Sequence, residues 1–285
     1  MKSFLQPIYY KLERKVASTS IPDVSKIPNR KKLAEFPFDE TCGVSFDHTK
    51  WDNVLKRHVK VAQGSIGDVN RINVVDYDGI KVDQDYLDYL VQLEEANLSA
   101  LQPAEQLAFW MNAYNALCIN IILQYEARNS CQISSITELS QKSNQVWDQV
   151  AGKIGGKEIS LNGIEHERLR KVWDEPLIHA CIVCASASCP DLRAEAFVVS
   201  SLRNQMEDQM RIWLKNDSKG IKLLDNSLQL SRIFLWFSAD FGELAGIKTF
   251  LSKYCSEDNE SLKERLANEK LSVQYFDYNW KINRA

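Results

Sequence analysis

The chain has 285 residues, of which 45% are hydrophobic and 26% are charged, and its formal net charge is −3. This composition is typical of a soluble globular protein with enough apolar residues for one large domain or two small ones. The slightly acidic balance gives no reason to expect nucleic-acid binding. No apolar run approaches the roughly 20 residues that span a bilayer. An odd number of cysteines, seven, without a secretory signal before them predicts reduced thiols and a cytoplasmic protein.

The N-terminal part differs from the rest of the chain. Residues 1–45 hold four of the seven prolines, and residues 1–32 carry eight Lys or Arg against two acidic residues. We expect a basic, solvated arm over residues 1–45, and the alternative is a segment that docks on an acidic partner or surface. Residues 46–285 are expected to form one compact domain.

Three helices are predicted in the first half of that domain. The segments 51–62 and 83–101 have the spacing of amphipathic helices. The second of them offers four core candidates: Leu87, Leu90, Val91 and Leu93. The apolar segment 103–127, "PAEQLAFWMNAYNALCINIILQYEA", predicts a buried helix that begins at Pro103.

Next come a hairpin, a helix and an apolar run. Residues 146–161 predict a β-hairpin that turns at Gly155–Gly156, and a helix is expected to follow, with Asn162 as its N-cap. The run 176–185, "PLIHACIVCA", predicts a buried strand.

Beyond the apolar run, the pattern predicts a helix within residues 195–215 and a strand leading into a turn within residues 227–241. The alternation indicates an α+β fold, in which several helices pack on a small, largely antiparallel sheet.

The segment "HACIVCASASCP", residues 179–190, concentrates potential chemistry. On a strand, His179 and Cys181 share one face, and Cys184 ends the strand where a rigid thiol is reachable from solvent. Cys189 lies in the following loop and is the alternative nucleophile. A zinc site is disfavoured because Cys181 and Cys184 would point to opposite faces. A redox pair is disfavoured because "CIVC" does not open a helix.

The segment "NGIEHERLR" supplies a possible base. Glu165 fits the capping-box position, and His166 stands near a helix N-terminus, where the macrodipole favours the neutral imidazole that a general base requires. Successive helical residues point about 100° apart, so Glu165 is poorly placed to orient His166. Asp191 and Asp240 are the alternative orienting acids.

Two asparagines lie three residues apart on the predicted buried helix. Buried amides need partners, so Asn112 and Asn115 are expected to pin loop backbone. The alternative is that Asn112 and Asn115 present amide donors to an oxyanion.

Five ordered motifs together resemble the domain of unknown function 547 (DUF547) family. They begin at residues 105, 156, 178, 230 and 278: "EQLAFWMNAYNAL", "GKEISLNGIEHERLR", "IHACIVCASASCPDL", "LSRIFLWFSADFG" and "YNWKIN". The resemblance covers the chain from about residue 50 to its end. A more distant likeness to the papain and transglutaminase superfamily implies a thiol, an imidazole and a carboxylate or amide in one site. In that superfamily, however, the cysteine usually opens the central helix and the histidine follows, so this chain would need a rearranged site.

Two functions follow from these patterns. The first is a cysteine-dependent hydrolase or acyl/amide-transfer enzyme that acts on a peptide or amide, with Cys184 as nucleophile and His166 as base. Cys189 and His179 are their alternatives, and no cofactor is needed. The second is a non-catalytic protein-interaction module on a degenerate enzyme fold.

Overall fold

The computed structural model describes residues 21–36, 45–141, 144–225, 227–255, 260–268 and 271–285, and its described residues fall into two compact units. One unit comprises residues 1–30 and 214–278, and the other comprises residues 31–213 and 279–285. Within the described residues no helix is long and apolar enough to cross a membrane.

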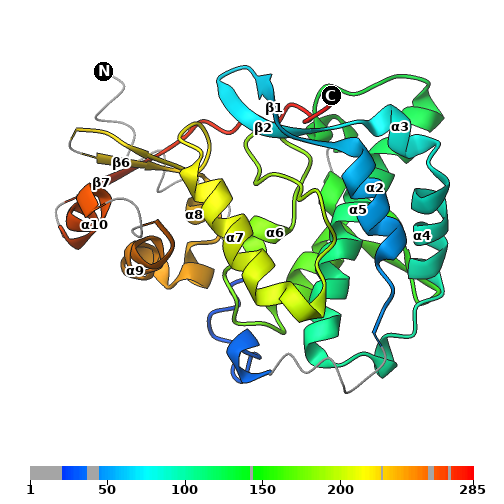
Figure 1. The fold of residues 1–285 in the computed structure, drawn as a ribbon, viewed down its shortest axis with the longest axis horizontal. Coiled ribbons are helices and arrows are strands. Elements are labelled where there is room, and N and C mark those ends of the chain that lie inside the picture. The colour runs from blue at the N-terminus through cyan, green and yellow to red at the C-terminus, as the bar shows by residue number, and fades with distance from the viewer. Residues whose placement is uncertain (1–20, 37–44, 142–143, 226, 256–259, 269–270) are drawn as a thin grey trace. The chain divides into compact units, whose positions relative to one another are not determined.

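The larger unit, 31–213 with 279–285, holds most of the regular elements (Figure 1). Its helices and strands are α2 (Thr49–His58), β1 (Val59–Ile66), β2 (Val69–Val75), α3 (Tyr77–Lys81), α4 (Gln84–Glu94), α5 (Pro103–Asn129), β3 (Val150–Ile154), β4 (Lys157–Ser160), a π-helix (Gly163–Arg170), α6 (Ile178–Cys181) and most of α7 (Leu202–Lys215). Short 3₁₀ turns connect them at Leu33–Glu35, Leu98–Ala100, Ile136–Leu139, Val146–Asp148 and Val199–Ser201.

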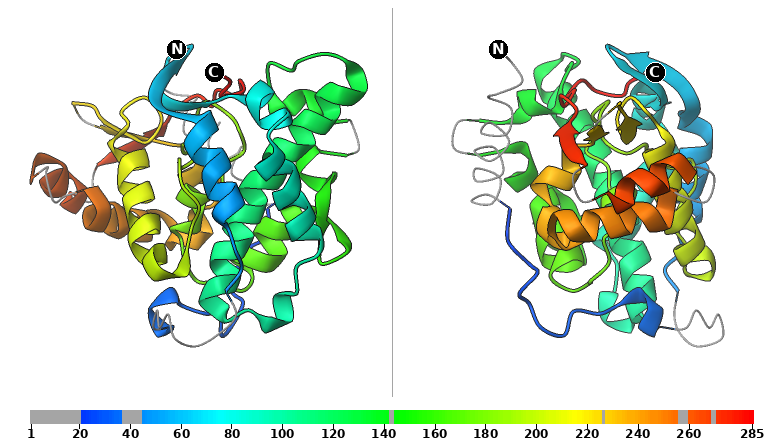
Figure 2. Two further views of the ribbon diagram at one scale, coloured as in Figure 1. Left: turned by 45° about the vertical axis from the view of Figure 1, so that its right-hand side comes forward. Right: turned by 90° about the vertical axis from the view of Figure 1, so that its left-hand side faces the viewer.

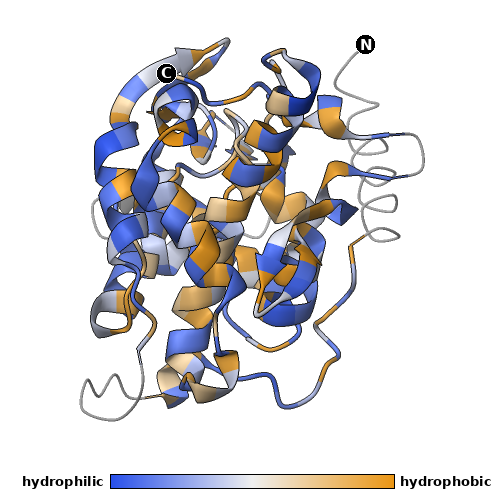
Figure 3. Ribbon diagram, turned by 90° about the vertical axis from the view of Figure 1, so that its right-hand side faces the viewer, coloured by the Kyte–Doolittle hydropathy of each residue, from blue (hydrophilic) through white to orange (hydrophobic). Residues whose placement is uncertain are grey.

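Helix α5 forms the core of this unit. It begins at Pro103, as predicted, and 19 of its 27 residues are buried. The apolar stretches of the ribbon lie mainly along the helices (Figure 3). Burial on most faces explains why the helix shows almost no amphipathic pattern, and it means that polar side chains on α5 must find partners inside the protein.

Helix α4 buries a different face from the one that the sequence predicted. Tyr86, Tyr89 and Leu93 are buried, whereas Leu87 and Val91 are exposed and Leu90 is half-buried. Tyr89 stacks on Trp51 of α2, with ring centroids 5.7 Å apart. The prediction was wrong for Leu87 and Val91 because the large tyrosine rings, which bury more area than aliphatic side chains, select the packed face.

The strands form small, separate sheets. The predicted hairpin β3–β4 is confirmed, and Gly155 and Gly156 both have positive φ, as a type I′ turn requires. The segment predicted as helix over 51–62 ends at His58, and β1 then pairs with β2 in an antiparallel hairpin that the sequence analysis missed. The α+β class is confirmed, but in the described part of the chain three small sheets replace the single one expected.

The smaller unit, 1–30 with 214–278, holds β5 (Ile221–Leu223), β6 (Ser227–Leu230), α8 (Ile233–Trp236), α9 (Glu243–Cys255), α10 (Glu260–Ala267) and β7 (Ser272–Tyr275), with a 3₁₀ turn at Ser238–Phe241. Strand β6 lies between β5, antiparallel to it, and β7, parallel to it. Helices α9 and α10 pack together, as the second view of Figure 2 also shows.

The predicted N-terminal arm is described only in part, since residues 1–20 and 37–44 lie outside the described residues, and Cys42 with them. The backbone of Lys31 is hydrogen-bonded to the larger unit and not to solvent. Its N–H donates to Val172 O at 2.8 Å, and its carbonyl accepts from Asp174 N. Leu33 is fully buried. Residues 31–36 therefore pack on the larger unit.

Candidate active site

The segment 176–185 is not the strand that its composition predicted. Residues Ile178–Cys181 form the single helical turn α6, and the chain becomes extended only at Ile182. The prediction was wrong because a short buried apolar run does not distinguish strand from helix. His179 and Cys181 therefore do not share a strand face, and both are buried.

Cys184 and Cys189 begin and end a tight loop. The backbone N–H of Cys184 donates to Cys189 Sγ at 3.1 Å, and Cys184 Sγ lies 3.5 Å from Ser186 Oγ. Ala185 has a φ of +61°, a conformation that costs a non-glycine residue free energy. Such a backbone persists only where neighbouring contacts hold it in place.

The C-terminal segment 279–285 supplies those contacts. Ala187 N donates to Lys281 O at 2.8 Å, and Asn283 N donates to Ala185 O at 2.9 Å, so that Ser186 faces Ile282 in an antiparallel bridge. In this type of pair the N–H of Ser186 points away from the partner chain. The structure gives neither that N–H nor the N–H of Ala185 an acceptor among the described residues.

Helix α5 holds the chain on either side of this loop through its two asparagines. Asn115 donates to Cys181 O at 2.8 Å and accepts from Val183 N at 2.9 Å. Asn112 likewise donates to Phe197 O at 2.8 Å and accepts from Phe197 N at 3.0 Å. Asn112 therefore pins backbone, which disfavours the alternative of an oxyanion donor.

The thiols differ in accessibility. Burial raises the pKa of Cys118 and of Cys181 well above the usual value, and the Cys181 thiol donates to Leu177 O at 3.3 Å. Cys189 is buried too, whereas Cys184 is half-buried and Cys131 is exposed. Cys184 is thus the thiol of the segment 179–190 that a reagent or substrate can reach.

The segment with Glu165 and His166 forms a π-helix, a rare element that is frequent at functional sites. His166 is buried, and its Nδ1 lies 3.0 Å from the Arg170 guanidinium. Because a guanidinium can only donate, Nδ1 accepts, and the imidazole is neutral with its proton on Nε2. The Nδ1 lone pair becomes available to a proton only when Arg170 releases it.

Glu165 does not complete a capping box, and Asn162 does not cap the helix. The side chain that accepts a hydrogen bond at the start of the helix is that of Ser160, whose Oγ accepts from Gly163 N at 3.0 Å. The Asn162 side chain instead donates to the Asp148 carboxylate at 2.7 Å. The buried carboxylate of Glu165 accepts from the Tyr114 hydroxyl at 3.4 Å.

Tyr114 lies close enough to Glu165, Cys184 and Cys189 to interact with them electrostatically, and the sequence analysis did not select it. Burial raises its pKa well above the usual value, and the negative charge of Glu165 acts in the same direction. Charges interact with a group in this way only when they lie near it. Its position next to Asn115 in "MNAYNAL" was the available signal.

The alternative acids lie in different units. Asp191 is buried and accepts from Asn73 N at 2.9 Å, which ties it to β2. Asp240 belongs to the smaller unit. Over the described part of the chain, no three His, Cys, Asp or Glu side chains gather as a metal site.

A comparison with protein families matches residues 98–214 to the model described as "Protein of unknown function, DUF547". The chain is a DUF547 domain-containing protein. The DUF547 match includes α5, the π-helix and the cysteine loop, and the motifs at residues 230 and 278 lie outside it. No curated protein and no solved structure matches the chain, so those comparisons add nothing to the family match.

Proposed function

We propose that the DUF547 domain is a cysteine-dependent hydrolase or acyl/amide-transfer enzyme with Cys184 as its nucleophile. The observation that carries the proposal is a half-buried thiol on a braced loop, followed by two backbone N–H groups, of Ala185 and Ser186, to which no acceptor is assigned among the described residues. A nucleophile next to such donors is the arrangement that acyl transfer requires.

In this reaction the catalytic imidazole takes the proton of the Cys184 thiol, and the resulting thiolate attacks the carbonyl carbon of a peptide or amide substrate. The resulting oxyanion accepts from the N–H groups of Ala185 and Ser186. Collapse expels the amine, which takes a proton from the catalytic imidazole, and leaves a thioester that water or a second nucleophile resolves. The thiolate needs a reducing compartment, and the cytoplasm meets that need.

His166 is the proposed base, with His179 as its alternative. The buried pair of Tyr114 and Glu165 is proposed to position the π-helix against α5. The distant likeness to papain and transglutaminase enzymes supports the same reaction class, although the order of histidine and cysteine in the chain is reversed.

The test is the rate of alkylation of each cysteine by iodoacetamide between pH 5 and 9, read by peptide mass spectrometry on the native protein. We expect Cys184 to react fast at pH 6, because a catalytic thiol is held as a thiolate. The exposed Cys131 is the internal reference. His166→Gln should slow Cys184 at pH 6 and leave Cys131 unchanged. Equal rates at Cys184 and Cys131 at every pH would contradict the proposal.

One set of contacts favours the second function, an interaction module without catalysis. Asn112 and Asn115 both pin backbone, and Arg170 occupies Nδ1 of His166. In that case the basic residues 1–32 would bind an acidic partner. Partner binding that survives Cys184→Ser with His166→Gln, but is lost when residues 1–32 are deleted, would establish this function in place of the first.

A further inference from the structure

The two cysteines of the loop 184–189 form a close pair. The backbone N–H of Cys184 donates to Cys189 Sγ at 3.1 Å. With an N–Cα bond of about 1.5 Å and the N–H aimed at the sulfur, Cys189 Sγ lies about 4 Å from the Cys184 Cα. In a disulfide each sulfur lies roughly 3–4.5 Å from the Cα of its partner. Cys189 Sγ is therefore already placed where a bond to Cys184 Sγ requires it.

The fold holds this pair together through backbone contacts. Cys189 N donates to Ser186 O at 3.0 Å, and Ser188 N donates to Asn279 O at 3.2 Å. Asn279 N in turn donates to Ser188 Oγ at 2.9 Å. These bonds turn the chain back on itself between the two cysteines. Joining the two sulfurs therefore requires little further ordering of the loop.

The two thiols differ in how a solute reaches them. Cys184 is half-buried, whereas Cys189 is only 4% exposed. A small reagent from solvent meets Cys184 first, and Cys189 lies behind it. An accessible thiol beside a second thiol that can bond to it is the arrangement found at cysteines that oxidise reversibly.

Two other thiols of the larger unit are less suited to pair with Cys184. Burial raises the pKa of Cys181, and its thiol donates to Leu177 O at 3.3 Å. Cys118 lies close enough to Cys184 to interact with it electrostatically, but burial raises its pKa well above the usual value too. Disulfides form by attack of a thiolate, so these two thiols react slowly. Cys189 instead has a backbone N–H aimed at its sulfur, which stabilises negative charge there.

We propose that Cys184 and Cys189 form a reversible oxidation site for hydroperoxides. Cys184 is the thiol that the hydroperoxide oxidises, and Cys189 then closes a disulfide with it. The inference rests on the proposed function for the reactivity of Cys184, and it adds a way in which that site is switched off. While the disulfide exists, Cys184 Sγ cannot attack a carbonyl carbon.

Two steps make the disulfide. The Cys184 thiolate attacks one oxygen of the hydroperoxide, so that an S–O bond forms, the O–O bond breaks and the leaving oxygen takes a proton from water. The sulfur loses two electrons to the peroxide and becomes a sulfenic acid. Cys189 Sγ then attacks Cys184 Sγ, the S–O bond breaks, and the hydroxide leaves with the Cys189 proton as water. Two molecules of a thiol reductant restore both cysteines by exchange and are themselves oxidised to a disulfide.

The experiment treats the reduced full chain with hydrogen peroxide at pH 7 and then blocks the remaining thiols with iodoacetamide. Mass spectrometry of the tryptic peptide 172–193 should show a mass about 2 Da below that of the reduced, unblocked Cys184–Cys189 pair. Fragmentation should place the lost hydrogens at Cys184 and Cys189, with Cys181 alkylated. Dithiothreitol should return both thiols.

Two matched variants test the role of the second sulfur. Cys189→Ser keeps an oxygen that can accept from Cys184 N, and it should raise the sulfenic acid trapped by dimedone at Cys184 at least about tenfold, because nothing consumes it. Cys181→Ser keeps a donor to Leu177 O and should leave the yield of disulfide unchanged.

Three results would overturn the proposal. In the unmodified protein these are oxidation of Cys184 to sulfinic acid without a disulfide, or a disulfide between Cys184 and Cys118 in place of Cys189. The third is an equal loss of disulfide in Cys189→Ser and Cys181→Ser. The proposed function fails by a different result, equal alkylation of Cys184 and Cys131 without peroxide. Fast alkylation of Cys184 at pH 6 without a peroxide-induced disulfide would refute the oxidation site alone.

Discussion

Asn115 of α5 and Cys181 at the end of α6 are joined by a hydrogen bond of 2.8 Å, from the amide Nδ2 to the backbone carbonyl. The same side chain accepts from Val183 N at 2.9 Å. One buried amide thus satisfies two backbone groups, one at the end of α6 and one in the extended chain that leads to Cys184. A buried backbone group without a partner is costly, so the approach to Cys184 depends on this residue.

Replacing Asn115 by Leu should therefore lower the free energy of unfolding by about 3 kcal/mol, because two buried backbone groups lose their partner. Urea denaturation measures the loss. Asn120→Leu on the same helix is the matched control. Among the described residues the Asn120 side chain makes one hydrogen bond, 2.7 Å to Ala151 O, so its loss should cost about half as much. Equal decreases in the free energy of unfolding for the two variants would show that Asn115 is not the main support of the backbone before Cys184.

The C-terminal segment should protect the cysteine loop. Deleting residues 280–285 removes the bonds that Lys281 and Asn283 make to Ala187 and Ala185. The strained Ala185 would then relax, and we expect iodoacetamide to reach Cys189, which is buried in the intact protein. Peptide mass spectrometry should show alkylation of Cys189 at least about tenfold faster, since protection follows local opening.

Deleting Ala285 alone is the control for that truncation. Its N–H bonds to Val75 O, and it makes no backbone bond to the cysteine loop. Cys189 should stay protected in this variant. If the longer deletion leaves Cys189 equally protected while the protein remains folded, the bracing role of the segment is wrong.

Local patterns were sufficient for parts of the fold. Pro103 and a long apolar run predicted α5, and Gly155–Gly156 predicted the β3–β4 turn, because each signal acts through neighbouring residues. The strand predicted for 176–185 failed because tertiary contacts, above all those of Asn115, decide the conformation of a short apolar run.

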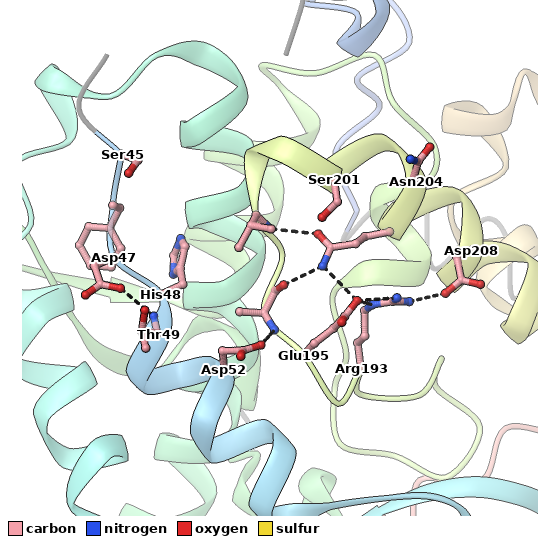
Figure 4. A pocket seen from close by; sticks show the side chains of 14 residues that line it. Ser45, Asp47, His48, Thr49, Asp52, Arg193, Glu195, Ser201, Asn204 and Asp208 are labelled. Carbon is pink, nitrogen blue, oxygen red and sulfur yellow. Dashed lines mark hydrogen bonds and ion pairs between the residues drawn. The ribbon is translucent and has the colours of Figure 1, made fainter. Parts of the chain in front are cut away.

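The candidate site was predictable in its residue types but not in its contacts. Cys184 could be selected because it ends the apolar run, and it is the half-buried thiol of its segment. For Tyr114 the sequence offered only its position next to Asn115, because its role depends on Glu165, 51 residues later in the chain. A polar pocket that His48 lines was also missed, since its walls come from segments about 150 residues apart (Figure 4).

His48 should make the protein less stable as the pH falls. Its pKa in the folded state is about 3, against 6.5 as the ordinary value, because burial penalises the charged ring. Between pH 6.5 and 3, His48 therefore binds a proton in the unfolded chain but not in the folded protein. The resulting loss of stability is absent above pH 6.5 and reaches roughly 2 kcal/mol at pH 5.

Chemical denaturation between pH 5 and 7 measures this slope, a range in which carboxylates with ordinary pKa values stay ionised. NMR should show the His48 ring neutral throughout. His48→Gln should reduce the dependence of the free energy of unfolding on pH, whatever its effect on stability at pH 7. A His48 resonance that titrates near pH 6.5 would show that the ring is accessible to water in the folded state.

Cys255, at the end of α9, supplies a baseline for every thiol measurement. Burial raises its pKa to about 12. At pH 8 its thiolate fraction is then about two thousandfold lower than that of a thiol with the ordinary pKa of about 8.5. We expect iodoacetamide to alkylate Cys255 far more slowly than the exposed Cys131, and its rate to rise about tenfold for each pH unit up to pH 10. If Cys255 reacts as fast as Cys131 in the folded protein, α9 opens readily, and slow alkylation of other buried thiols cannot be attributed to burial alone.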